Sequence, residues 1–157
     1  SPVQIRHMEE HKPPYRIVAP GPVYRYEATD ATHETVFHQM EGLMVDETTN
    51  IATFKGVMET FFRYLFDEEI EIRLRPSYFP FTEPSFEIDL KWPESDEWLE
   101  VFGAGMVHKQ VLKNVGVNPQ YQGFAFGMGI ERVIMLKYGI TDIRHFHSAD
   151  LGFIQQF

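Results

Sequence analysis

The stretch GFAFGMGIERVIMLKYGI, residues 123–140, combines three glycines with a following segment of helical periodicity. Apolar residues lie on nearly all sides of a helix over 130–138, which is typical of a buried helix. Arg132 falls in its first turn, where the helix dipole favours anions over cations. Two interpretations remain open: an internal ion pair, with Glu131 or another carboxylate, or a guanidinium that reaches a bound phosphate or base in a cleft.

The glycines that precede this helix match neither the dinucleotide-binding fingerprint nor a phosphate-binding loop with its lysine. Small residues instead allow another group to approach the backbone closely. If the segment is extended, Ala125 faces the opposite side from Phe124 and Phe126. The stretch therefore predicts a helix with an adjoining binding surface.

Outward from this stretch, alternating segments are separated by turns and by helical patterns. Strands are expected at 16–19, 23–27, 36–45, 69–75, 85–92 and 98–105, helices at 1–11, 51–66, 109–115 and 130–138, and a loop at 116–123. In the helix at 51–66, the expected core positions are Ala52, Val57, Phe61 and Leu65. This order predicts an α+β fold, with a mainly antiparallel β-sheet flanked by helices.

The composition limits the class of protein. With 157 residues and 43% hydrophobic content, the chain suits one globular domain over 1–157. No apolar run approaches the roughly 20 residues of a membrane span, and the absence of cysteine excludes disulfides and thiolate metal sites. A net charge of −9 argues against a basic nucleic-acid-binding face on this chain alone. The seven histidines, including HFH at 145–147, match no standard metal-site spacing.

A predicted hairpin gathers charged side chains. Alternation places Arg25 and Glu27 on one face of the first strand, and groups Gln39 and Glu41, with Phe37, on one face of the second. A solvated sheet face would explain this pattern. The connecting loop, which contains Asp30, His33 and three threonines, carries an unusual density of groups that can hold phosphate or ribose, and this favours a binding site.

The segment RPSYFPFTEP, residues 75–84, places two phenyl rings two residues apart. Phe79 and Phe81 share one side of an extended run that Pro80 and Pro84 stiffen. The rings fit either plain core or an edge-to-face clamp on an aromatic ligand. Glu83, at the end of this apolar stretch, needs a partner, and a divalent cation is one candidate.

These segments together resemble a known family. VYRYE with the loop to HQMEG (38–42), FPFTEP (79–84), GAGMVH (103–108) and GFAFGMGIER (123–132) are similar to sequences in the α subunits of bacterial phenylalanyl-tRNA synthetases. VYRYE and its loop resemble motif 2 of the class II aminoacyl-tRNA synthetases, and GMGIER resembles motif 3. FPFTEP and GFAFG narrow the resemblance from the class II synthetases in general to those for phenylalanine. It spans nearly the whole chain.

The resemblance implies the class II catalytic fold and ATP-dependent activation of L-phenylalanine to phenylalanyl-adenylate, followed by transfer to tRNA(Phe). It implies ATP as substrate, Mg²⁺ as cofactor, a cytoplasmic location without membrane contact, and a β-subunit partner in a heterotetramer of two α and two β chains. The implied catalytic residues are Arg25 and Arg132. The implied ATP-binding residues are Arg25, Glu27, His33 and Arg132; those for the amino acid are Ser1, Gln39, Glu41, Phe79, Phe81, Ala125 and Gly127; and Glu83 would bind Mg²⁺ in a site shared with the β subunit.

Two features of the family are missing from the chain: the N-terminal coiled-coil arm and motif 1. We therefore expect a single domain that is the C-terminal portion of the catalytic core, truncated at its N-terminus and with little activity alone. The family's contacts to tRNA come largely from other regions and the β chain, which accommodates the acidic charge. Two alternatives stay open: a paralogue that activates another acid or only binds nucleotide, and a noncatalytic module that binds an aromatic ligand.

Overall fold

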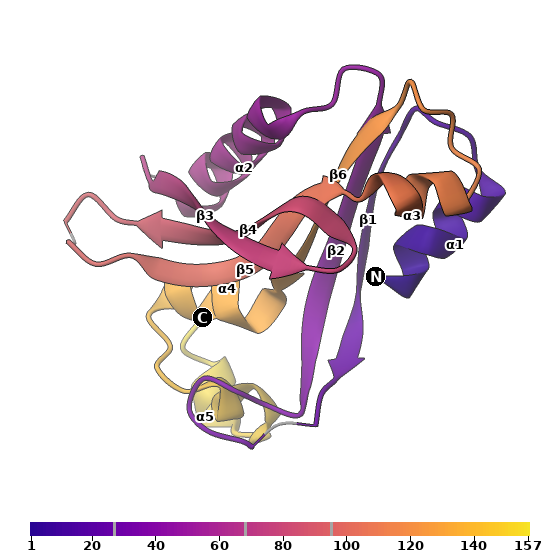
Figure 1. Cartoon of the computed structure of the whole chain (residues 1–157). Helices are drawn as coiled ribbons and strands as arrows, with labels where there is room; N and C mark the ends of the chain where they lie inside the picture. The colour runs from indigo at the N-terminus through magenta and orange to yellow at the C-terminus, as the bar shows by residue number, and fades with distance from the viewer. Residues whose placement is uncertain (27, 68, 95) are drawn as a thin grey trace.

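A computed structural model describes residues 1–26, 28–67, 69–94 and 96–157. Six strands form one sheet in the order β1-β2-β6-β5-β4-β3, and every neighbouring pair is antiparallel (Figure 1). The α+β expectation is therefore confirmed. The strands are β1 (Tyr15–Tyr24), β2 (Val36–Asp46), β3 (Glu71–Phe79), β4 (Thr82–Lys91), β5 (Leu99–Val107) and β6 (Gln122–Gly129).

Helices flank the sheet and connect its strands. Asn50 starts α2 by accepting a hydrogen bond from the Thr53 N–H, and Gly139, with φ of 66°, ends α4 in the left-handed conformation. The helices are α1 (Pro2–Glu10), α2 (Ile51–Phe66), α3 (Lys109–Asn114), α4 (Ile130–Tyr138), the 3₁₀ helix η1 (Ile143–His147) and α5 (Leu151–Ile154). Among the described residues, none of these is long and apolar enough to cross a membrane.

The two faces of the sheet carry separate cores. On one face, α2 packs against a large core to which Met44 and Phe124 belong. On the other face, α1 and α3 cover a smaller core that includes Leu43, Val45 and Ala125. Adjacent strand residues therefore point to opposite faces, as the alternation around Ala125 predicts. Only part of this second face is covered by helices, and the rest is available for a site.

Three local predictions differ from the structure. The strand β1 runs unbroken through Pro20-Gly21-Pro22 instead of forming two runs, because β1 lies at the edge of the sheet, where a missing N–H is tolerated. It ends at Tyr24, short of the predicted residue 27, and Glu27 itself lies outside the described residues. Residues 122 and 123, predicted as the end of a loop, instead begin the central strand β6.

The buried side of α2 is also rotated from the predicted one. Its buried residues are Phe54, Met58 and Phe62, whereas Ala52 and Val57 are exposed. Phe61 and Leu65 pack only at the margin of the core. The helix is apolar enough that two neighbouring i, i+4 rows compete, and the sheet selects the row that carries two phenylalanines.

Candidate functional site

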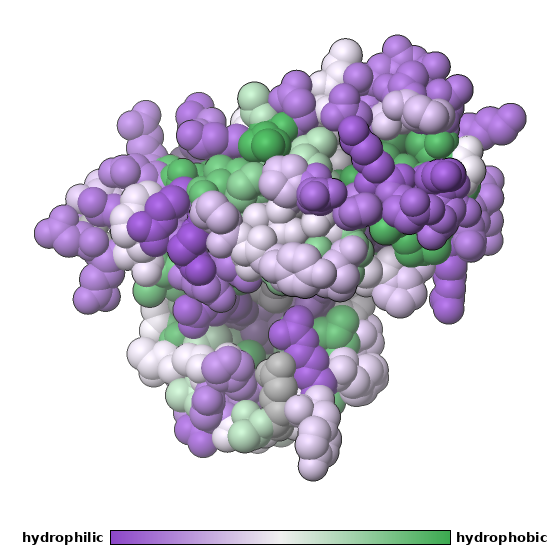
Figure 2. Space-filling model, viewed as in Figure 1, coloured by the Kyte–Doolittle hydropathy of each residue, from purple (hydrophilic) through white to green (hydrophobic). Residues whose placement is uncertain are grey.

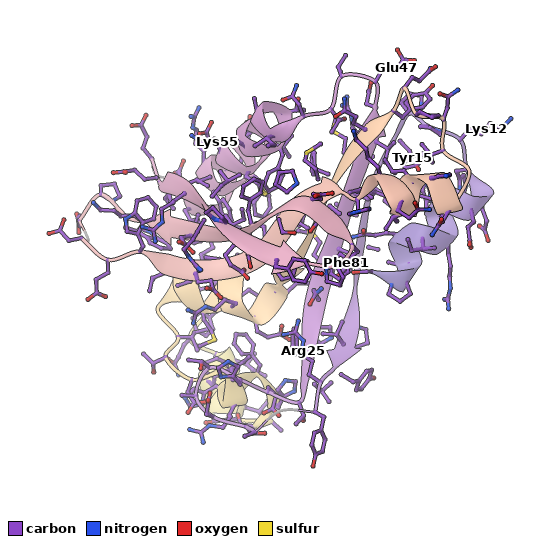
Figure 3. All side chains as sticks on the ribbon, viewed as in Figure 1. Lys12, Tyr15, Arg25, Glu47, Lys55 and Phe81 are labelled. Atoms are coloured by element: carbon purple, nitrogen blue, oxygen red, sulfur yellow. The ribbon has the colours of Figure 1, made fainter. Side chains whose placement is uncertain are left out.

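A cavity of about 560 Å³ lies over the uncovered part of the sheet. Its walls come from α1, the loop 28–35, β2, the turn between β3 and β4, β5, β6 and the start of α4. Figure 2 shows the surface hollowed between the sheet and the C-terminal helices, and Figure 3 labels two lining residues, Phe81 and Arg25, from the same side. The predicted site residues that line the cavity are Ser1, Arg25, His33, Gln39, Glu41, Phe79, Phe81, Ala125, Gly127 and Arg132.

Two paired glycines form part of the cavity floor. Gly103 on β5 lies opposite Gly127 on β6 in the sheet register. A Cβ on Gly103 would lie 2.6 Å from the ring of Phe79, and one on Gly127 would lie 2.5 Å from the side-chain nitrogen of Gln39 and 2.9 Å from a carboxylate oxygen of Glu41. Glycine at both positions therefore lets these three side chains lie close against the sheet.

The aromatic pair forms one wall of the cavity. The rings of Phe79 and Phe81 are nearly parallel, with an angle of 12° and centroids 6.0 Å apart. Phe81 is 46% exposed, so the pair is not ordinary core. Ala125 also lines this cavity, while its neighbour Phe124 packs into the α2 core. The result is an apolar slot with a small side chain in its lining.

Beside the slot lies a buried carboxylate. Glu41 is only 8% exposed, so the face of β2 that carries it is not the solvated one that alternation alone permits. Gln4 donates its amide to one Glu41 oxygen at 2.7 Å, and Gln39 donates to the other. The oxygen that Gln4 contacts also lies 3.2 Å from the ammonium nitrogen of Ser1 and 3.5 Å from its hydroxyl. A buried carboxylate that two amides and an ammonium group contact can also accept from the ammonium group of a ligand. The sequence did not indicate Gln4, because it contacts Glu41 across 37 positions of the chain.

Arg25 lies just beyond the end of β1. Its backbone N–H donates to the Thr35 carbonyl at 2.9 Å, which ties together the two sides of the loop. Its guanidinium donates to Gln39 at 3.4 Å and lies 4.9 Å above the ring of Phe37. Alternation groups Phe37 with Gln39 and Glu41, but it did not predict that the Phe37 ring would lie beneath the Arg25 guanidinium. Arg25 therefore adjoins the polar row of β2.

Arg132 lies in the lining of the cavity and not against Glu131. Glu131, 4% exposed, does not pair with it: its carboxylate accepts hydrogen bonds from the backbone N–H and the ring Nδ1 of His38, each at 2.8 Å. The interpretation that Arg132 forms an ion pair with Glu131 is thus wrong. Within the described ranges, Arg132 makes no hydrogen bond or ion pair to another side chain, and it lines the cavity. Burial all round the helix is also wrong, since Lys137 and Tyr138 are exposed.

The loop 28–35 brings His33 to the same cavity. Asp30 accepts hydrogen bonds from the backbone N–H groups of Thr32 and His33, at 2.7 and 2.8 Å, and contacts the His33 ring at 3.0 Å. These hydrogen bonds lower the pKa of Asp30, the backbone bond from Thr32 being the largest contribution. The carboxylate is therefore ionised and organises the loop. The sequence placed Asp30 among the loop groups that can hold phosphate or ribose, but it did not predict the contact of Asp30 with the His33 ring.

An ionic network adjoins the cavity on β3, β4 and β5. Asp89, 1% exposed, accepts hydrogen bonds from Arg73 at 2.7 Å and from Arg75 at 3.1 Å. Burial alone would raise the pKa of Asp89, but the hydrogen bonds from Arg75 and Arg73 outweigh it and lower that pKa. Arg75 also bonds Glu100, which lines the cavity together with Glu87. No sequence pattern singled out this network, because its members lie on three different strands.

Glu83 lies outside the lining of the cavity. Its side chain is 77% exposed, and one carboxylate oxygen lies 3.3 Å from His108 Nε2. In the described part of the chain, no three His, Asp or Glu residues gather where they could hold a metal ion. Because Mg²⁺ prefers six oxygen ligands, this single carboxylate fits such a site only if water or another chain completes the set.

The chain has relatives among curated proteins. It is 56% identical over 158 residues to proteins named phenylalanine--tRNA ligase alpha subunit from Vibrio campbellii and from Shewanella sp. (strain MR-7). In each case the match covers 100% of this chain and 48% of the relative. The chain thus spans about half the length of these curated relatives.

Solved structures share the fold at low sequence identity. A pyrrolysyl-tRNA synthetase from Desulfitobacterium hafniense superposes with a TM-score of 0.64 at 18% identity, over 96% of this chain and 52% of that one. The PylSc structure from the same organism gives a TM-score of 0.60 at 19% identity, over 88% and 48% of the two chains. The model of the family described as "tRNA synthetases class II core domain (F)" matches residues 1–157. The chain therefore belongs to the class II tRNA synthetase core-domain family.

Proposed function

We propose that this chain is the catalytic part of a phenylalanine–tRNA ligase α subunit. It would activate L-phenylalanine with ATP to give phenylalanyl-adenylate and pyrophosphate, and then transfer the phenylalanyl group to tRNA(Phe). The names of the relatives from Vibrio campbellii and Shewanella sp. support the phenylalanine assignment. The family match supports the general chemistry of aminoacylation.

The observation that carries the proposal is the combination of groups in one cavity. An apolar slot between Phe79, Phe81 and Ala125 suits a phenyl ring. The buried carboxylate of Glu41 beside it suits the ammonium group of an amino acid, with Gln39 and Ser1 as further polar contacts. This distribution matches the two ends of phenylalanine.

The arginines supply the chemistry required by the phosphates. The carboxylate of phenylalanine would attack the α-phosphorus of ATP, and pyrophosphate would leave with the electrons of the broken P–O bond. Arg25 would donate to the α-phosphate and stabilise the charge that develops on its oxygens. In the second step, the terminal ribose hydroxyl of tRNA would attack the acyl carbon, and AMP would leave. Neither step needs a covalent enzyme intermediate, because positioning and charge stabilisation are sufficient.

The remaining ATP contacts extend this assignment. Arg132, in the cavity, would stack on adenine near the γ-phosphate, and His33 would contact the nucleotide or the tRNA end. Glu27 would accept from the adenine amino group. Gly127 with Ala125 would form the floor beneath the substrate ring.

We further propose that Glu83 is a Mg²⁺ ligand in a site completed by the β subunit. Bound there, the ion would supply positive charge next to this part of the chain. The single carboxylate beside His108 supports a shared site rather than one built by this chain alone. A cytoplasmic heterotetramer of two α and two β chains is thus the proposed working form. The chain by itself is expected to activate phenylalanine weakly or not at all.

The direct test is amino-acid-dependent pyrophosphate exchange by the assembled α and β subunits. With a panel of the twenty amino acids, phenylalanine should support exchange far better than any other. Efficient exchange with a different amino acid would favour a paralogue of altered specificity. Phenylalanine binding that ATP does not influence, without any exchange, would favour a noncatalytic module.

A variant of the slot makes this test specific to the proposed site. Ala125→Gly removes a methyl group from the slot, and one methyl in an apolar pocket corresponds to about 1–3 kcal/mol of discrimination. The ratio of exchange efficiencies for para-chlorophenylalanine and phenylalanine should therefore rise by about 5- to 150-fold. Ala52→Gly, at the exposed start of α2, is the matched control and should leave the ratio unchanged. An unaltered ratio in Ala125→Gly would remove Ala125 from the slot.

A further inference from the structure

Asp30 makes more contacts than closing a turn requires. Its Oδ1 accepts from the backbone N–H groups of Thr32 and His33 and from the Thr32 hydroxyl, at 2.7, 2.8 and 2.9 Å. Both of its carboxylate oxygens also lie 3.0 Å from Nδ1 of the His33 ring. One carboxylate therefore fixes both the backbone of this loop and the imidazole that the loop presents to the cavity.

This contact decides which ring nitrogen of His33 can meet a ligand. Nδ1 also lies 3.0 Å from the Thr32 hydroxyl, which itself donates to Asp30. Since the carboxylate only accepts and this hydroxyl donates elsewhere, Nδ1 is the atom that carries the hydrogen in both contacts. The ring then has Nε2 as its second polar atom, and no other described side chain bonds it. His33 lines the cavity with Arg25 and Arg132. Its Nε2 is therefore the atom with which this loop can bind an entering group.

The loop is also held from outside. The N–H of Ile143, at the start of η1, donates to the Ala31 carbonyl at 2.9 Å, and the Ile143 side chain is buried against the cavity. In Figure 1 the loop between β1 and β2 wraps around the C-terminal helices. Ala31 directly follows Asp30, so this backbone bond fixes the position from which Asp30 reaches His33.

The electrostatic surroundings of Asp30 and His33 are of mixed sign. From η1, Arg144 interacts with both Asp30 and Glu34, and His147 interacts with Glu34. Asp142 pairs with Arg144 at the start of the same helix. Arg144 therefore opposes the negative charge of Asp30, while the Nδ1 contact remains the one direct bond from Asp30 to the ring.

We propose that Asp30 is a positioning residue that acts through His33, orienting the imidazole so that Nε2 binds the phosphates or ribose of ATP. This inference rests on the proposed function, because it assigns the loop side of the cavity to the nucleotide. It assigns no contact with ATP to Asp30 itself.

The test uses the assembled enzyme and the variants Asp30→Asn, His33→Ala and the double variant. Asparagine retains an acceptor oxygen for the backbone bonds of the turn but lacks the charged acceptor for Nδ1. We expect Asp30→Asn to raise the KM for ATP in pyrophosphate exchange by about 3- to 10-fold, which corresponds to the net contribution of one typical hydrogen bond. The KM for phenylalanine should change by less than about 2-fold.

The double variant separates positioning from structure. If Asp30 acts through His33, Asp30→Asn should add almost nothing in the His33→Ala background. Equal effects of Asp30→Asn in both backgrounds would overturn the proposal, as would an equal rise of both KM values with a lower melting temperature. Asp46→Asn is the matched control: Asp46 also faces a turn N–H and pairs with an arginine, but at the far end of β2. It should behave as wild type.

Calorimetric titration with ATP alone keeps the two proposals distinguishable. If wild type binds ATP but shows no phenylalanine-dependent exchange, the proposed function fails, while weaker ATP binding by Asp30→Asn would still support the role of Asp30. If wild type exchanges normally and Asp30→Asn binds ATP equally well, only the inference about Asp30 fails. Absence of ATP binding in wild type would overturn both.

Discussion

Arg25 shows how one residue can connect two halves of a reaction. Its guanidinium bonds Gln39, which in turn donates to Glu41 in the proposed amino-acid site. A guanidinium also has the forked geometry that suits a phosphate. An interaction that strengthens as charge develops on the α-phosphate should affect the chemical step more than substrate binding.

We therefore predict that Arg25→Ala in the assembled enzyme slows adenylate formation about 10²- to 10³-fold. Phenylalanine binding should weaken by no more than about 3-fold, which is less than one neutral hydrogen bond. Arg25→Lys should recover little of the rate, because an ammonium group cannot reproduce the forked geometry. Rapid-quench kinetics and calorimetry measure the two quantities. Arg16→Ala, at an exposed arginine near the start of β1, is the control. Equal losses of rate and affinity in Arg25→Ala would show that its charge is merely structural.

At the scale of single residues, the sequence predicted the site residues that alternate along one strand. It did not predict contacts between residues that are far apart in the sequence. Gln39 and Glu41 could be found because β2 repeats every two residues. Gln4 and the pair of His38 with Glu131 could not, since their contacts span 37 and 93 positions. The family resemblance, rather than periodicity, gave Gln39 and Glu41 their expected roles in binding the amino acid.

At the scale of elements, the site depends on two strands that present glycine to each other. Gly103 and Gly127 are paired on β5 and β6, and the ring of Phe79 and the side chains of Gln39 and Glu41 lie against them. The helix α4 was predicted at its observed bounds, whereas β6 was not predicted as a strand. Glycines lower the strand signal of β6, although here they are what its neighbours require.

Gly103→Ala should move the aromatic wall. The new methyl group would lie 2.6 Å from the Phe79 ring, so the ring must shift. We expect the KM for phenylalanine to rise about 10-fold or more, since small misplacements of positioning groups are costly. The KM for ATP should change little. Pyrophosphate exchange with each substrate varied in turn measures both values.

The matched control is Gly21→Ala on the edge strand β1, where an added Cβ meets nothing within 4 Å. It should leave both constants unchanged. If Gly103→Ala also left the phenylalanine KM unchanged, Phe79 would not contact the substrate ring.

At the scale of the whole molecule, the ion network around the buried Asp89 joins the three strands opposite the β1 edge. Asp89 on β4 binds Arg73 and Arg75 from β3, and Arg75 continues to Glu100 on β5. Since the pKa of Asp89 is lowered in the folded protein, its contribution to stability is complete above the pKa of the unfolded chain. That contribution is lost as the pH falls below about 4.

We predict that Asp89→Asn lowers the stability of the assembled enzyme at pH 7 by about 1.5–3 kcal/mol, the range for hydrogen bonds to a charged group. The difference from wild type should narrow as the pH falls from 4 toward 3, because the Asp89 carboxylate of the unfolded wild-type chain then binds a proton, which stabilises the unfolded state relative to the folded one. Melting temperatures measured across pH 3–7 check this. A difference that stays constant over that range would show that ionised Asp89 is not the stabilising species, and Asp46→Asn should show little change throughout.

The prolines of β1 have a consequence for encounters between molecules. The His38 N–H points away from β1, toward Glu131, so the pairs of Pro22 with His38 and Pro20 with Met40 are not hydrogen-bonded pairs of the β1–β2 ladder. The nitrogens of Pro20 and Pro22 therefore face outward, where an incoming strand would need donors. Val18 and Tyr24 are exposed along the same strand and would otherwise make it attractive to a second copy. Two missing donors interrupt any such intermolecular ladder, so the described edge discourages aggregation by strand addition.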